Sequence, residues 1–86
     1  MAKITMYTTG VCPFCRMAER LLEAKGVKHI DQVRIDLEPE KRAEMMQKTG
    51  RRTVPQIYIG ATHVGGFDEL AALENAGRLD ELLRGE

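Results

Sequence analysis

The hydrophobic pattern changes its period within the first 26 residues, and this change constrains the fold more than any other feature of the sequence. Residues 3–8 alternate between two faces and contain β-branched side chains, which is typical of a strand. Gly10 interrupts the alternation. From Phe14 to Leu22 apolar residues recur at helical spacing opposite charged ones, and Gly26 provides a stop. The chain therefore begins with a strand, a tight turn and a helix, as α/β folds do.

The rest of the chain continues this alternation of strands and helices. The sequence predicts a strand over 32–37, a helix from Glu38-Pro39-Glu40 to Gly50, a strand over 56–59, a hairpin turn at 60–61 into a strand over 62–64, a third helix ending near Gly77, and a short helix over 78–83. The βαβ crossover makes the first two strands parallel, and the hairpin makes the last two antiparallel.

Length and charge limit the classes of function. Eighty-six residues fit one domain, which we expect to span residues 1–86. Thirteen Lys and Arg balance thirteen Asp and Glu, so nothing predicts electrostatic capture by nucleic acid or by an anionic membrane. No stretch approaches the roughly 18 apolar residues of a membrane span, and the N-terminus lacks an apolar signal segment. We therefore expect a cytoplasmic protein.

Both cysteines lie in one motif, Cys12-Pro13-Phe14-Cys15, where the first strand gives way to the helix. Pro13 suits the first helical position because its missing N–H has no partner there. A sulfur at this helix start faces free N–H groups and the positive end of the helix dipole, which favour the thiolate. The spacing predicts a nucleophile at Cys12 and a resolving thiol at Cys15.

Two other interpretations of the pair stay open at this point. A structural disulfide closes so short a loop that it removes only about 2 kcal/mol or less of unfolded-state entropy. A zinc site needs two further ligands, and the candidates are His29 and His63. They lie 34 positions apart, not at the short spacing of zinc fingers.

With Thr53-Val54-Pro55 and Gly65-Gly66-Phe67-Asp68, the cysteine motif makes the chain resemble the glutaredoxin family from end to end. The resemblance implies an α/β, thioredoxin-like fold, with a four-stranded mixed sheet and helices on both faces. It also implies a glutathione-disulfide oxidoreductase that reduces protein disulfides and protein–glutathione mixed disulfides. Two positions depart from the family's pattern, because Phe14 replaces its usual Tyr and Thr9 replaces a common Lys.

The resemblance assigns roles to residues beyond the catalytic Cys12 and Cys15. It implies that Pro55 is cis and that Val54 presents its backbone to the substrate beside Cys12. The γ-glutamyl carboxylate of glutathione would lie on the N–H groups of Gly66, Phe67 and Asp68, with its ammonium against Asp68. Arg42 would bind the glycyl carboxylate. The substrate-binding residues implied are Phe14, Arg42, Thr53, Val54, Pro55, Gly66, Phe67 and Asp68.

The resemblance also implies partners. Glutathione is the expected co-substrate, and no metal is required. The protein partners would be disulfide-containing or glutathionylated proteins, with ribonucleotide reductase as one electron acceptor, and we expect a monomer that binds neither nucleic acid nor membrane. Two other functions were weighed: a redoxin reduced by thioredoxin reductase, and an iron–sulfur cluster carrier. Pro13 argues against the cluster carrier because it stiffens the loop.

Overall fold

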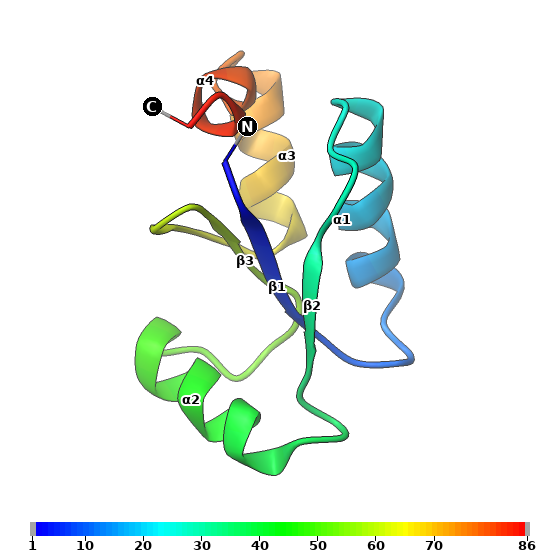
Figure 1. Ribbon diagram of the computed structural model, residues 1–86, viewed down its shortest axis with the longest axis vertical. Coiled ribbons are helices and arrows are strands. Elements are labelled where there is room, and N and C mark those ends of the chain that lie inside the picture. The colour runs from blue at the N-terminus through cyan, green and yellow to red at the C-terminus, as the bar shows by residue number, and fades with distance from the viewer. Residues whose placement is uncertain (1, 86) are drawn as a thin grey trace.

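The computed structural model describes residues 2–85, so the ends of the expected domain, residues 1 and 86, lie outside the described residues. Figure 1 shows the eight elements in chain order. They are β1 (Ile4–Thr8), α1 (Pro13–Ala24), β2 (Asp31–Arg34), α2 (Pro39–Thr49), β3 (Gln56–Ile59), β4 (Thr62–Gly65), α3 (Phe67–Asn75) and α4 (Leu79–Leu83).

The four strands form one mixed sheet in the order β2-β1-β3-β4. β1 pairs parallel with β2, as the βαβ crossover requires, and antiparallel with β3. β3 pairs antiparallel with β4 through the hairpin predicted at 60–61. The central strand β1 therefore leads directly from the sheet into the turn that holds Cys12.

Helices cover both faces of the sheet. On one face, buried residues of α1, α3 and α4 pack against Ile4 and Met6 of β1. On the other face, Met45 of α2 packs against Tyr7 of β1 and Ile35. Figure 1 shows α2 well apart from the other three helices. The expected four-stranded mixed sheet with helices on both faces is therefore confirmed.

The second strand is shorter than its pattern predicted. The alternation of Val33, Ile35 and Leu37 predicted a strand to residue 37, but β2 ends at Arg34. The chain turns there, because the N–H groups of Leu37 and Glu38 both donate to the Arg34 carbonyl, at 3.3 and 3.1 Å. Ile35 still enters the core, whereas Leu37 is 67% exposed. The prediction of a strand over 32–37 was therefore wrong at its C-terminal end.

The two ends of the described chain meet at the far end of β1 from the cysteines. The Ala2 N–H donates to the Leu83 carbonyl at 2.9 Å, and Figure 1 shows the start of β1 beside α4. The start of β1 is thereby tied to the last helix.

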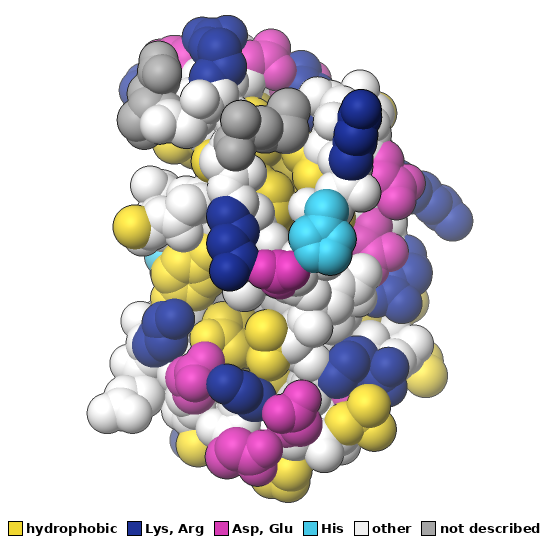
Figure 2. Space-filling model, in the orientation of Figure 1, with side chains coloured by type: hydrophobic (Ala, Val, Ile, Leu, Met, Phe, Trp, Pro, Cys, Tyr) yellow, Lys and Arg dark blue, Asp and Glu magenta, His cyan; other side chains and the backbone are white. Residues whose placement is uncertain are grey.

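Charged side chains of both signs are interspersed on the face that Figure 2 shows. Asp31 illustrates the mixing, because it lies 3.2 Å from the Lys3 ammonium and 2.7 Å from His29. Within residues 2–85, no helix is long and apolar enough to cross a membrane.

Candidate redox site and its groove

Cys12 and Cys15 lie at the N-terminus of α1. Cys12 is the N-cap residue, Pro13 follows at the start of the helix, and Cys15 lies in the first turn. Their Cα atoms are 5.2 Å apart and their sulfurs are bonded to each other. This separation is ordinary for a disulfide. The sequence-predicted pair is therefore placed to form and break an intramolecular disulfide.

The two sulfurs differ in exposure and in hydrogen bonding. Cys15 is fully buried, whereas 9% of Cys12 is exposed. The Cys15 backbone N–H donates to the Cys12 sulfur at 3.1 Å. That donor belongs to the group of unpaired N–H groups at a helix start, which stabilise negative charge. Of the two cysteines, Cys12 is thus the more exposed and the one whose sulfur accepts a helix-start N–H.

The segment from Thr53 to Pro55 lies beside Cys12. The Val54–Pro55 peptide bond is cis, as the resemblance implied. The Val54 carbonyl oxygen is 3.9 Å from the Cys12 sulfur. Val54 therefore presents its backbone carbonyl to the Cys12 sulfur.

A buried amide fixes this segment from beneath. Gln56 is fully buried, and its Nε2 donates to the Thr53 carbonyl at 2.9 Å. Its Oε1 lies 2.8 Å from Nε2 of His63 on β4. Because the amide nitrogen serves Thr53, the amide oxygen must accept from His63, which places a proton on His63 Nε2. The sheet thus holds the segment before the cis peptide bond through two side chains.

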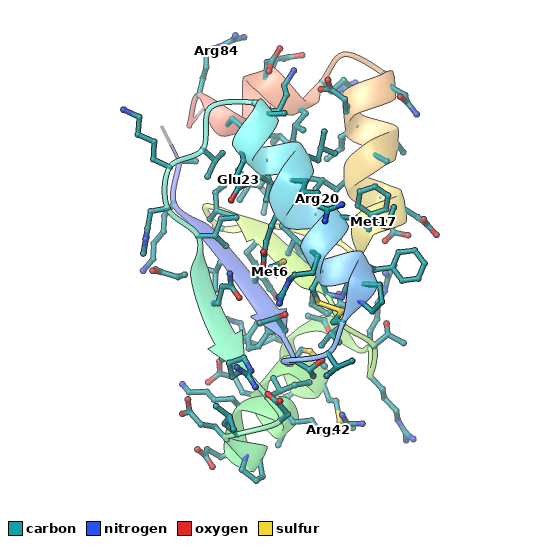
Figure 3. The ribbon with its side chains drawn as sticks, turned by 90° about the vertical axis from the view of Figure 1, so that its right-hand side faces the viewer. Met6, Met17, Arg20, Glu23, Arg42 and Arg84 are labelled. Atoms are coloured by element: carbon teal, nitrogen blue, oxygen red, sulfur yellow. A yellow bond between two sulfur atoms is a disulfide. The ribbon has the colours of Figure 1, made fainter. Side chains whose placement is uncertain are left out.

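A groove of about 220 Å³ lies between Phe14 of α1, the 53–55 segment and the start of α3, and its lining includes Val54 but neither cysteine. The rings of Phe14 and Phe67 stand at one side, with centroids 6.4 Å apart. Arg42, on α2 in Figure 3, is exposed and is not among the lining residues. The other seven residues predicted to bind substrate all line the groove: Phe14, Thr53, Val54, Pro55, Gly66, Phe67 and Asp68.

Two charged residues complete the lining, Arg51 and Glu69. The Glu69 Oε1 accepts from the Gly66 N–H at 2.7 Å and lies 3.2 Å from Arg51 Nη1. Neither Arg51 nor Glu69 is among the residues that the sequence predicted to bind substrate. The signal was an acidic residue three positions after a helix N-cap, which is the second half of a capping box. The N-cap residue here is Gly66, so the sequence lacks the Ser or Thr that usually marks a capping box.

Glu69 predicts a pH-dependent contribution to stability. The hydrogen bond from Gly66 and the Arg51 guanidinium hold the pKa of Glu69 below its ordinary value of 4.5. A depressed carboxyl pKa stabilises the fold above about pH 4.5, and that contribution is lost as pH falls through the folded-state pKa. Urea unfolding of wild type, Glu69→Gln and Glu69→Ala between pH 7 and pH 3 measures this contribution to the free energy of unfolding.

We expect Glu69→Gln to retain the cap, because glutamine also accepts the Gly66 N–H, and to flatten the decline in stability below pH 4.5. Glu69→Ala should cost about 1 kcal/mol at pH 7. If wild type and Glu69→Gln lose stability in parallel as the pH falls, the charge of Glu69 contributes nothing.

The histidines weighed as zinc ligands lie elsewhere. His29 bonds to Asp31, and His63 bonds to Gln56. In the described part of the chain, no group of three or more His, Cys, Asp or Glu side chains is arranged to hold a metal ion.

Comparisons with known proteins agree with this geometry. Residues 4–64 match the family model described as Glutaredoxin. A glutaredoxin of Neisseria meningitidis serogroup A is 58% identical over 83 residues, 96% of this chain and 98% of that protein. Glutaredoxin 3 of Escherichia coli K12 is 48% identical over 84 residues, 98% of this chain and 100% of that protein.

Solved structures extend the likeness to three dimensions. The solution structure of a Brucella melitensis glutaredoxin superposes with a TM-score of 0.84 at 47% identity, covering 96% of this chain and 89% of that one. A buckwheat glutaredoxin–glutathione complex gives 0.88 at 27% identity, covering 96% and 77%. These likenesses confirm the thioredoxin-like fold. The chain therefore belongs to the glutaredoxin family and, with its Cys12–Cys15 pair, is a thiol–disulfide oxidoreductase.

Proposed function

We propose that the chain reduces protein–glutathione mixed disulfides and protein disulfides with electrons from glutathione. The observation that carries the proposal is the groove beside Cys12, which seven of the predicted glutathione-binding residues line. The solved buckwheat relative was crystallised with glutathione, which supports the same ligand here.

The first step is a thiol–disulfide exchange at Cys12. The Cys12 thiolate attacks the glutathione sulfur of a mixed disulfide, so a Cys12–glutathione bond forms as the glutathione–protein bond breaks. The protein cysteine leaves as a thiolate and takes up one proton. The Cys15 N–H stabilises the attacking thiolate before the step.

The second step returns Cys12 to its thiolate. A glutathione thiolate attacks the glutathione sulfur of the adduct, which releases oxidised glutathione and the Cys12 thiolate. For a protein disulfide, Cys12 first forms the intermolecular link, and the Cys15 thiolate then attacks Cys12 and releases the reduced protein. The resulting Cys12–Cys15 disulfide is the bond present in the structure. One glutathione thiolate then attacks Cys12 and frees the Cys15 thiolate, and a second attacks the adduct and releases oxidised glutathione and the Cys12 thiolate.

The start of α3 provides the contacts proposed for the γ-glutamyl end. Asp68 is exposed in the first turn and faces the groove, where its carboxylate suits an ammonium group. The Gly66 N–H already donates to Glu69. The γ-glutamyl carboxylate of glutathione would therefore accept hydrogen bonds from the N–H groups of Phe67 and Asp68. Arg42 is proposed for the glycyl carboxylate from α2, and Arg51 adds a cation at the groove itself.

The test is turnover of a small glutathione mixed disulfide coupled to glutathione reductase. We expect wild type to turn over, and Asp68→Asn to raise the KM for glutathione about tenfold, because the substitution removes a charge-assisted hydrogen bond of about 1.5 kcal/mol. Glu23→Gln, on the exposed side of α1, is the matched loss of one carboxylate and should leave KM unchanged.

If wild type fails with glutathione but accepts electrons from thioredoxin reductase, the proposal is wrong and the reductase-fed redoxin replaces it. A brown protein with visible absorbance indicates a cluster carrier instead. The protein substrates, ribonucleotide reductase among them, the monomeric state and the cytoplasmic location stay predictions.

A further inference from the structure

A second groove lies on the other side of Phe67, between α1 and α3. It has a volume of about 390 Å³, and Met17, Leu21, Phe67 and Ala71 form its apolar part. Figure 3 shows Met17 and Arg20 on α1 beside α3. Because Phe67 lines both grooves, this α1–α3 groove neighbours the groove that holds the predicted glutathione-binding residues.

Each of the two grooves has an exposed apolar side chain of α1 in its lining, Phe14 in the first and Met17 in the second. Phe14 is 55% exposed and Met17 is 39% exposed, and both lie on the first two turns of α1. Exposed apolar surface that adjoins a reaction site is characteristic of a surface that contacts a partner.

The charges at the groove favour an acidic partner. Glu74 lines the groove, but its carboxylate is held by Lys25 at 3.0 Å. Arg20 lines the groove too, and within residues 2–85 it forms no ion pair. One cation is therefore left to pair with an incoming carboxylate.

We propose that the α1–α3 groove binds the protein half of the disulfide substrate, as an extended segment with an apolar and an acidic side chain near its reactive cysteine. The inference rests on the proposed function, in which glutathione occupies the first groove. A mixed disulfide bound across Phe67 then has its glutathione on one side and its protein on the other, and the protein is the leaving group of the first step.

Helix geometry sets the spacing in that segment. Met17 lies five residues after Cys12, about 7.5 Å along the helix at 1.5 Å per residue, and Arg20 lies about 12 Å along it. An extended chain covers about 3.3 Å per residue, so these distances correspond to about two and four residues from the substrate cysteine. Residues two and four away lie on the same face of an extended segment, which satisfies both contacts at once.

The experiment uses synthetic peptides with one cysteine, in which the residue two positions away is Leu or Gln and the residue four positions away is Asp or Lys. Both are placed either before or after the cysteine. Each peptide is capped on its cysteine with glutathione or with free cysteine. The release of peptide thiol is followed in a single turnover with the reduced Cys15→Ser chain, without added glutathione.

With Met17 and Arg20 intact, we expect the Cys15→Ser chain to release thiol about tenfold faster from peptides with Leu than from peptides with Gln, on one side of the cysteine. Burial of a leucine-sized side chain predicts a difference of this size. Met17→Gln should reduce that preference to about one. Arg20→Glu should reverse the preference for Asp over Lys at low ionic strength. The matched controls, Leu37→Gln and Arg78→Glu, change an exposed leucine and an exposed arginine outside both grooves and should keep both preferences.

The two proposals fail separately in this design. Equal rates for glutathione and cysteine caps contradict the glutathione site, whereas the Leu preference reports on the α1–α3 groove under either cap. The inference is overturned if Leu gives no advantage on either side, or if Met17→Gln leaves the advantage intact. It is also overturned if sedimentation shows a dimer that Met17→Gln dissociates, because a second copy then covers the groove.

Discussion

Replacement of Cys12 by serine is expected to reduce turnover of a glutathione mixed disulfide to the uncatalysed level, while Cys15→Ser retains activity. Cys12 is the more exposed of the two cysteines and its sulfur accepts the Cys15 N–H, whereas a hydroxyl at that position does not ionise at neutral pH. Cys15 is fully buried, and in the proposed mechanism it acts only when a protein disulfide is resolved within the chain. Coupled assays with a small mixed disulfide and with a protein disulfide measure the two routes.

Circular dichroism of both serine variants controls for folding. Cys15→Ser should turn over the small mixed disulfide but should accumulate a covalent complex with the protein disulfide, which mass spectrometry detects. Activity of Cys12→Ser with Cys15 intact would assign the nucleophile to Cys15 and contradict the exposure argument.

Substitution of Gln56 by leucine is expected to destabilise the fold by about 2 kcal/mol, which lowers Tm by about 10 °C. Leucine matches the volume of the buried amide but leaves His63 Nε2 and the Thr53 carbonyl without their partner. Because Thr53 leads into the segment beside Cys12, kcat/KM for disulfides should fall as well, by about tenfold. Urea unfolding and the coupled assay measure the two effects.

His63→Phe provides the matched partner for a double-mutant cycle. Phenylalanine keeps a ring against Tyr58, whose centroid lies 5.1 Å from that of His63, but it donates no hydrogen bond. In the double variant neither side of the Gln56–His63 contact is left with an unpaired group, so the combined cost should be about 1 kcal/mol smaller than the sum. Strict additivity would show that the two side chains act independently.

The strand–turn–helix start was predictable because both periods are local and because Gly10 and Pro13 mark the transition between them. The end of β2 was not predictable, since the alternation of Val33, Ile35 and Leu37 continues past the turn. The turn that ends the strand is closed by the Leu37 and Glu38 N–H groups on the Arg34 carbonyl, and Asp36 within it accepts the distant Gly10 N–H at 3.1 Å. Such contacts across 26 residues leave no periodic signal.

The site was predictable wherever a residue's role follows from its neighbours in the chain. The position of Cys12 as N-cap followed from Pro13, and the resemblance implied the cis bond at Pro55. Gln56 was not identified because its role depends on the His63 side chain that the sheet brings to it, and Glu69 was not identified because its N-cap partner is a glycine. Arg42 lies outside the groove because its helix covers the other face of the sheet.

The hydrogen bond between Ala2 and Leu83 makes the protein suitable for circular permutation. The chain nearly forms a closed ring, and the closure lies one full strand away from the sulfurs. A short linker across it would permit new ends at the exposed Gly60–Ala61 turn, with each side chain at Cys12 left in place. Any cargo fused at the original ends would point away from the substrate.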